Sequence, residues 1–168
     1  GINELVSAFV RLNKSHPNTK LVLVGPAEDD LDPVTPYTAR QIEECAAIES
    51  AGSQKDVRPY YEKADALVFP SYREGFPNVV IEAGAMELPS IVTDINGSRE
   101  IISNGENGLV VPPRDEAALF EAMKYMVEHR DSAEQMGKRA RLSVANRYEQ
   151  SFVRRCLKTY YCEILARK

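Results

Sequence analysis

The stretch "SYREGFPNVVIEAGAMELPSIVTD", Ser71–Asp94, decides the predicted fold of this chain. It begins with a loop that contains Gly and Pro, continues from about Asn78 as an apolar helical run, and ends in the short β-rich run "PSIVTD" (89–94). A second β-rich run, "DALVFPS" (65–71), directly precedes it. A strand, a helix and a strand of these lengths form a right-handed βαβ unit, so the sequence predicts a parallel sheet.

Two carboxylates stand eight positions apart within this stretch. Glu82 lies in the run 79–86, which is otherwise almost wholly apolar, so the pattern predicts a charge in a buried helix. Burying such a charge costs several kcal/mol unless a partner pairs with it. Glu74 lies in the loop, directly before Gly75. This spacing raises the question of what the two acids bind.

The same alternation of strands and helices continues along the rest of the chain. Further strands are predicted in "KLVLVG" (20–25), as a buried strand, and in "NGLVV" (107–111). Helices are predicted at 2–14, 39–49, 58–64, 78–88, 97–103, 115–129, 132–148 and 149–168, and the acidic, proline-rich segment 26–38 is predicted to be a loop. The expected fold class is α/β, with a Rossmann-like parallel sheet, helices on both faces and extra C-terminal helices, in one domain over residues 1–168.

Composition restricts the classes of function. The 168 residues suit one domain with a full core, and the net charge of −4 argues against a broad nucleic-acid surface. No apolar run approaches the roughly 18 residues of a membrane span, and no signal peptide opens the chain. Three Cys without a C-x-x-C pair, and only two His, argue against a zinc site and favour a reduced, cytosolic setting.

The loop 72–77 follows the predicted end of a strand, and ligands of parallel sheets bind outside the carboxyl ends of the strands. A helix that starts near Asn78 offers free N–H groups and a partial positive charge, which suit a phosphate. Gly75 lets the backbone approach a ligand closely, and Pro77 needs no N–H at the start of the helix. The segment therefore predicts a phosphate site.

Glu74 and Glu82 lie on either side of this predicted phosphate site. Carboxylates accept hydrogen bonds from sugar hydroxyls but repel phosphate, so the two acids fit hydroxyl-bearing rings at the two ends of one elongated anion. A nucleotide sugar has this shape.

The segment "PSYREGFPNVVIEAGAMELPSIVTD" (70–94) resembles the donor-site signature of the group 1 glycosyltransferases, the large family-four group of retaining enzymes with the GT-B fold. The mark of this signature is Glu, seven residues and Glu, with Gly-Phe or Gly-Leu after the first acid. The segment "NGSREIISNGENGLVVPPRDEAALFEAM" (96–123) resembles the closing segment of the same family. In overall sequence the chain is most similar to bacterial enzymes of capsule and lipopolysaccharide biosynthesis.

The resemblance implies a role for each residue of the signature. Glu74 is the implied catalytic residue and contacts hydroxyls of the transferred sugar on the reacting face. The implied contacts to the sugar and pyrophosphate come from the backbone of Gly75, Phe76 and Pro77 and from the N–H groups of Asn78 and Val79. Glu82 is the implied ligand of the ribose hydroxyls. The base is expected near "SAGSQKD" (50–56), around Gly52 and Ser53.

The implied function is that of the donor-binding, C-terminal half of a hexosyltransferase. The full enzyme would move a sugar from a nucleoside diphosphate sugar, with UDP as the first choice, to a saccharide or lipid-linked acceptor in cell-surface polysaccharide synthesis. The resemblance implies no metal and no cofactor, because the helix dipole, an Arg and a Lys offset the charge of the leaving group. It implies a cytoplasmic location, with peripheral contact at the inner face of the plasma membrane as a further option.

The sequence departs from the family at two places. The Arg and Lys of the family lie on a strand just before a Gly like Gly1, so we expect a domain truncated at its N-terminus, without that strand and without the acceptor domain, and inactive alone. In "AAIESAGSQ" (46–54), Glu49 and Ser50 interrupt the β-rich run that the family usually has there.

Other interpretations of the same residues stay open. The chain could be a non-catalytic nucleotide-sugar-binding or regulatory module, a GT-B epimerase or phosphorylase, or a plain flavodoxin-like domain, which would not need Glu82. Glu82 alone could pair with a nearby Lys or Arg, and Glu74 could form a solvated pair with Arg73. The basic run "KRARLSVANRY" (138–148) fits a solvated helix face or a membrane surface.

Overall fold

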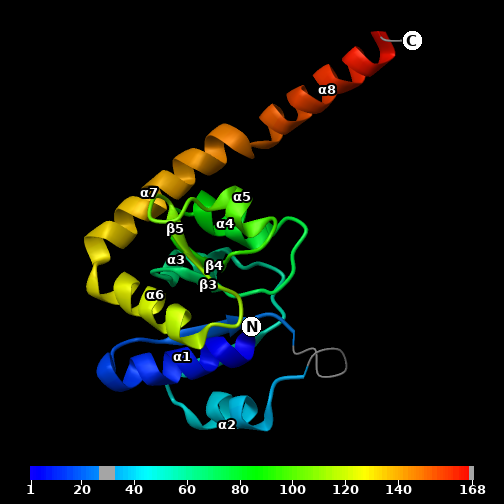
Figure 1. Cartoon of the computed structure of the whole chain (residues 1–168). Coiled ribbons are helices and arrows are strands. Elements are labelled where there is room, and N and C mark those ends of the chain that lie inside the picture. Colours follow the sequence, from blue (N-terminus) through cyan, green and yellow to red (C-terminus); the bar gives the residue numbers. More distant parts are fainter. Residues whose placement is uncertain (27–32, 167–168) are drawn as a thin grey trace.

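The computed structural model describes residues 1–26 and 33–166 of the chain (Figure 1). Strands and helices alternate along the described residues. The strands are β1 (Leu21–Val24), β2 (Ile48–Gly52), β3 (Leu67–Phe69), β4 (Ser90–Thr93) and β5 (Gly108–Val111). The helices are α1 (Ile2–Ser15), α2 (Pro36–Glu44), α3 (Arg58–Lys63), α4 (Asn78–Ala85), α5 (Ser98–Ile101), α6 (Glu116–Glu128), α7 (Arg130–Arg147) and α8 (Gln150–Ala166). Part of the loop predicted over 26–38 lies outside the described residues. Its last three residues, 36–38, belong to α2.

All strand pairs in the described residues are parallel. One sheet has the order β3-β4-β5, and β1 pairs with β2 in a second sheet. Side chains of a strand alternate between two faces, so in β4 Ile91 lies in one hydrophobic core and Val92 in another. In the first core, α1 and α6 pack against both sheets. In the second core, α4 and α5 pack against the three-stranded sheet. Helices therefore cover both faces of that sheet, which confirms the predicted α/β class.

The predicted helix over 39–49 is wrong at both ends. Thr35 caps α2 through its side-chain oxygen, which accepts a bond from the N–H of Thr38, so the helix begins earlier at Pro36. It ends at Glu44, and Ile48 enters β2, where it is buried and pairs with Leu21. Polar residues fit this strand because its outward positions face solvent.

Two predictions of burial also need correction. The helix predicted as buried on all sides, α4, ends at Ala85 and buries only Val80, Ala83 and Gly84. It lies on the sheet and against α7, so Glu82 projects from an uncovered side and is exposed. The strand β1, predicted as buried, leaves Val22 and Val24 more than a third exposed.

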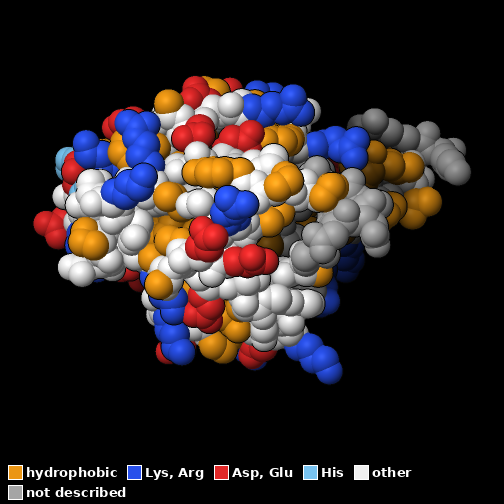
Figure 2. All heavy atoms as spheres, turned by 90° about the horizontal axis from the view of Figure 1, so that it is seen from below, with side chains coloured by type: hydrophobic (Ala, Val, Ile, Leu, Met, Phe, Trp, Pro, Cys, Tyr) orange, Lys and Arg blue, Asp and Glu red, His pale blue; other side chains and the backbone are white. Residues whose placement is uncertain are grey.

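The C-terminal helix α8 projects from the body of the molecule (Figure 1) and contains no buried residue. Figure 2 shows the molecule from the side of α2, with Lys and Arg side chains scattered between Asp and Glu side chains, and apolar side chains on the protruding C-terminal arm. Among the described residues, no helix is both long enough and apolar enough to cross a membrane.

Candidate functional site

The loop between β3 and α4 lies at the carboxyl end of β3, as the sequence predicted. The strand ends at Phe69 and α4 begins at Asn78, so the segment 70–77 leads from the sheet edge to a helix N-terminus. Pro77 occupies the N-cap position and makes no side-chain cap. In the described part of the chain, the N–H groups of Asn78 and Val79 donate no hydrogen bond to a loop or to a capping group, so they are available to an anion.

Glu74 is held in place within this loop. The Ser71 hydroxyl donates a hydrogen bond of 2.7 Å to Oε1 of Glu74, and the Thr93 hydroxyl at the end of β4 donates to the carbonyl of Ser71. Gly97, with a φ of +82°, packs beneath the loop, since a Cβ there would lie 2.6 Å from the Gly75 carbonyl oxygen. The Glu74 carboxylate is therefore oriented by Ser71, whose backbone is in turn held by Thr93 of β4.

Glu82 is supported by a residue that the sequence did not single out for this role. The Tyr61 hydroxyl, on α3, donates to Oε2 of Glu82 and to the carbonyl of Val79, at 3.3 Å each. Burial raises the pKa of Tyr61 to about 12, and the nearby Glu82 carboxylate adds to this rise. Tyr61 therefore remains a hydrogen-bond donor to Glu82 well above neutral pH.

The simple ion-pair interpretations of the two acids are not supported. Within residues 1–26 and 33–166, neither Glu74 nor Glu82 forms an ion pair, and Arg73 forms none either. Both carboxylates instead accept hydrogen bonds from neutral hydroxyl groups. Each therefore keeps spare acceptor capacity for a ligand.

The other predicted site residues lie at two places. Phe76 is 44% exposed and its ring contacts the edge of Tyr148, with ring centres 5.4 Å apart. Gly52 ends β2 with a φ of +63°, and its carbonyl accepts a bond from the N–H of Gly25. Residues 74–82 thus lead from the end of β3 into α4, whereas Gly52 and Ser53 lie at the end of β2 in the other sheet.

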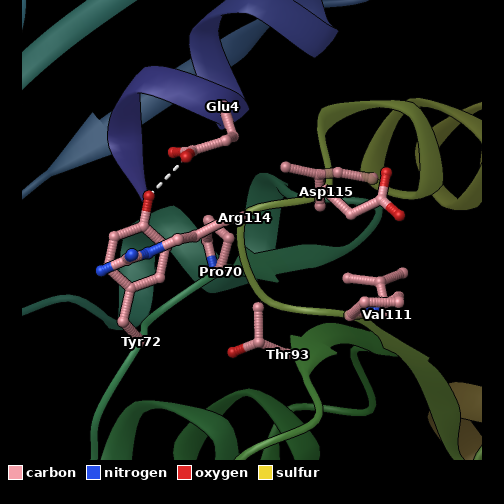
Figure 3. Close-up of a pocket in the computed structure, with 9 residues that line it drawn as sticks. Glu4, Pro70, Tyr72, Thr93, Val111, Arg114 and Asp115 are labelled. Carbon is pink, nitrogen blue, oxygen red and sulfur yellow. Dashed lines mark hydrogen bonds between the residues drawn. The ribbon is translucent and has the colours of Figure 1, made fainter.

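A small cavity of about 10 Å³ lies beside the loop (Figure 3). Figure 3 shows the Tyr72 hydroxyl directed at Glu4 of α1, with an O···O distance of 2.5 Å. The guanidinium of Arg114 lies over the Tyr72 ring, 4.7 Å from its centre. Sequence reasoning missed these contacts, because residues 68 positions apart leave no local pattern.

No group of three His, Cys, Asp or Glu side chains in the described residues is close enough to hold a metal ion.

Comparisons with known proteins place this geometry in context. A family model described as "Glycosyl transferases group 1" matches residues 1–143. The capsular polysaccharide biosynthesis glycosyltransferase CapM of Staphylococcus aureus is 29% identical over 163 residues, which cover 96% of this chain and 42% of CapM. A Campylobacter jejuni relative, N,N'-diacetylbacillosaminyl-diphospho-undecaprenol alpha-1,3-N-acetylgalactosaminyltransferase, is 31% identical over 114 residues, 68% of this chain and 30% of that protein.

The fold has close counterparts among solved structures. The sucrose-phosphate synthase of Thermosynechococcus elongatus superimposes with a TM-score of 0.84 at 27% identity, over 100% of this chain and 43% of that chain. The chain therefore spans less than half the length of these relatives.

Proposed function

The chain belongs to the group 1 glycosyltransferases, and we propose that it is the donor-binding part of a retaining enzyme that transfers a sugar from a nucleoside diphosphate sugar. Its parallel sheets and flanking helices match the C-terminal domain of GT-B glycosyltransferases. Homologues of this chain carry names of polysaccharide glycosyltransferases, which favours transfer over the epimerase, phosphorylase and binding-module alternatives.

One observation carries the proposal. The segment from Glu74 to Glu82 runs from the carboxyl end of a parallel strand into a helix N-terminus, with a carboxylate on each side of that N-terminus. A pyrophosphate suits the helix end, and each carboxylate suits the hydroxyls of a ring. We assign Glu74 to the transferred sugar, the backbone of Gly75, Phe76 and Pro77 to the sugar and pyrophosphate, and Glu82 to the ribose.

The remaining assignments rest on the family pattern. The N–H groups of Asn78 and Val79 would hold phosphate oxygens, and the base would lie toward Gly52 and Ser53 at the end of β2. UDP is the first nucleotide to test. We propose that transfer requires neither a metal ion nor a cofactor, because the positive end of the α4 dipole offsets charge on the leaving group.

We propose a saccharide or lipid-linked acceptor in cell-surface polysaccharide synthesis. The name of the S. aureus relative specifies capsular polysaccharide, and that of the C. jejuni relative specifies a diphospho-undecaprenol acceptor, which supports a lipid-linked alternative. Lipopolysaccharide synthesis is a further candidate setting. For such acceptors we propose a cytoplasmic location in a bacterium, with peripheral contact at the inner face of the plasma membrane as a further option.

Residues 1–168 would form one nucleotide-sugar-binding domain, with the acceptor domain on another part of a longer protein. The chain spans 42% of the CapM length, which leaves room for such a domain. In addition, β1 and β3 each pair with only one other strand in the described residues, so each leaves one edge unpaired. A further strand that carries the family's Arg and Lys could pair at one of these edges.

Kinetics on the full-length protein test the division of roles. Glu82→Gln should raise the donor KM, because a ribose contact made equally in the ground state and transition state contributes uniform binding. Glu74→Gln should lower kcat, because it contacts the reacting sugar. Glu121→Gln, at an exposed position of α6, serves as the control. Equal effects of both changes on KM alone would overturn the assignment, and nucleotide binding without any transfer would favour the non-catalytic module.

A further inference from the structure

We infer that Glu4 and Arg114 are positioning residues for the loop 71–77 and that they act through Tyr72. This inference rests on the proposed function, because the loop matters only if Glu74 meets the transferred sugar. The proposed contacts to the nucleotide sugar come from Glu74, Gly75 and the residues that follow them. The Tyr72 hydroxyl instead donates to Glu4 of α1 (Figure 3).

The contact between Tyr72 and Glu4 connects the loop to α1, a helix that packs in the core. The phenol donates to Oε1 of Glu4 at 2.5 Å, and charge-assisted hydrogen bonds of this length are about twice as strong as neutral ones. Glu4 lies in the first turn of α1, where the helix dipole favours a negative charge. Leu5, Val6 and Phe9 of the same helix are at most 3% exposed, so the anchor itself is rigid.

The second oxygen of Glu4, Oε2, is buried and has no hydrogen-bond partner among the described residues. Burying a carboxylate in this way is costly for the fold, and an apolar side chain at this position would avoid the cost. The hydrogen bond from Tyr72 to the other oxygen, Oε1, is the favourable interaction that offsets this cost. This balance favours a role for Glu4 in fixing the loop, in addition to its favourable place in the first turn of α1.

Arg114 holds the same ring from another element. It lies between β5 and α6, with its guanidinium over the Tyr72 ring, a cation–π contact. Its φ of +60° lies in the left-handed region, which a non-glycine residue adopts at a cost in energy. The next residue, Asp115, caps α6 by accepting a bond from the N–H of Ala118, which fixes the direction of the turn.

Together these contacts fix the backbone just before Glu74. The Thr93 hydroxyl donates to the Ser71 carbonyl, and the Ser71 hydroxyl donates to Glu74. Tyr72, between them, is held by α1 and by the turn before α6. The Glu74 carboxylate is thus aimed by supports from separate parts of the chain, while Glu82 is supported separately by Tyr61.

This separation gives a specific kinetic prediction. Loosening the Tyr72 anchor should disturb the orientation of the sugar-side carboxylate and lower kcat, and it should leave nucleotide affinity unchanged. A misplacement of 1 Å in a reacting group can cost roughly 100-fold in rate, so partial loosening should cost about tenfold.

The test uses the full-length enzyme with a UDP-sugar that it accepts. Tyr72→Phe keeps the ring and the Arg114 contact but removes the hydroxyl, and it should lower kcat about tenfold with the Kd for UDP unchanged within about twofold. Glu4→Ala should do the same, whereas Glu4→Gln, which keeps an acceptor oxygen, should restore most of kcat. Arg114→Gly removes the guanidinium and relieves the backbone strain, so it should lower kcat without lowering Tm.

Tyr125→Phe is the matched control. It removes a hydroxyl near the C-terminal end of α6, where His16, the residue after α1, lies 3.4 Å from Glu128. This end is away from the loop, so the change should leave kcat unchanged. The inference is overturned if Tyr72→Phe has wild-type kcat in an enzyme in which Glu74→Gln lowers kcat. It is also overturned if Glu4→Gln and Glu4→Ala lose kcat equally. Failure of Glu74→Gln and Glu82→Gln to affect transfer or donor binding would instead contradict the proposed function.

Discussion

At the residue scale, Tyr61 offers a spectroscopic test of the site. Burial and the Glu82 carboxylate raise its pKa from the ordinary value of 10.0 to about 12. The folded state therefore favours the neutral phenol, and this contribution to stability is present below pH 10 and is lost as the pH rises from 10 to 12. Ultraviolet titration of the wild type minus Tyr61→Phe should show one phenol that ionises near pH 12. A difference curve centred near pH 10 would show that Tyr61 is solvated and that it does not support Glu82.

Gly97 allows a second test at this scale. Its φ of +82° disfavours any side chain, and a Cβ would lie 2.6 Å from the carbonyl oxygen of Gly75. Gly105 has a similar φ of +78° with no atom within 4 Å of its Cβ position, so it is a matched control. Gly105→Ala should lower the free energy of unfolding by about 1 kcal/mol, and Gly97→Ala by about 2–4 kcal/mol, in denaturant titrations. Equal losses would mean that the loop yields freely to a methyl group at residue 97.

Single residues also show how far sequence reasoning reached. The spacing of Glu74 and Glu82 around Gly75 and Pro77 led to the candidate segment, because this signal lies within nine consecutive residues. The environment of Glu82 was predicted wrongly, because the apolar run does not reveal that α4 is covered on only part of its surface. The supports from Tyr61 and Glu4 come from distant parts of the chain and leave no periodic pattern.

At the scale of elements, the strands β1, β3, β4 and β5 follow directly from β-rich runs, which short apolar segments between turn residues predict well. The strand β2 was missed because it pairs with β1 alone and exposes Glu49, and exposed strand positions carry no apolar signal. Lys20 donates to Glu49 at 2.5 Å across this pair and lowers the pKa of that carboxyl. Tertiary pairing thus determined this strand where local sequence did not.

Packing of α7 against the end of α4 gives a prediction at the same scale. A Cβ at Gly137 of α7 would lie 1.9 Å from the carbonyl oxygen of Glu87, which is backbone and cannot move aside cheaply. Gly137→Ala gains about 1 kcal/mol of helix propensity but loses more through overpacking, so we expect a net loss of about 1–2 kcal/mol. Gln135→Ala, exposed on the same helix, should change stability by less than about 0.5 kcal/mol. A more stable Gly137→Ala variant in thermal unfolding would show that the helices can separate at little cost.

At the scale of the whole molecule, the C-terminal arm differs from the rest of the chain. Residues 130–168 contain ten Lys and Arg against four Asp and Glu, although the chain as a whole is acidic. The helix α8 buries nothing and exposes many large apolar side chains, namely Phe152, Val153, Leu157, Tyr160, Tyr161, Ile164 and Leu165. An amphipathic helix of this kind gains stability mainly from a packed partner surface.

Removal of residues 150–168 should therefore leave the fold intact and reduce self-association of the isolated chain. Because α8 contributes no buried residue, the unfolding midpoint should change little. Sedimentation velocity over a range of concentrations should show association for the full chain and monomers for the shortened one. The fold prediction is contradicted if the shortened chain loses its cooperative unfolding transition.

The proposed pyrophosphate site is the N-terminus of α4. A single helix N-terminus supplies about half a positive charge, worth roughly 0.3–2 kcal/mol, and the chain has a net charge of −4. We therefore expect the isolated chain to bind nucleoside diphosphates weakly, near millimolar, which corresponds to about −4 kcal/mol, and to transfer no sugar alone.

Amide shift mapping by NMR during titration with UDP, GDP and ADP tests this claim most directly. For a ligand that binds, the account predicts the largest shifts at the amides of residues 75–82, with Asn78 and Val79 foremost, and weaker shifts in Glu82→Gln. Perturbed amides that lie away from residues 75–82 for every nucleotide that binds would contradict it.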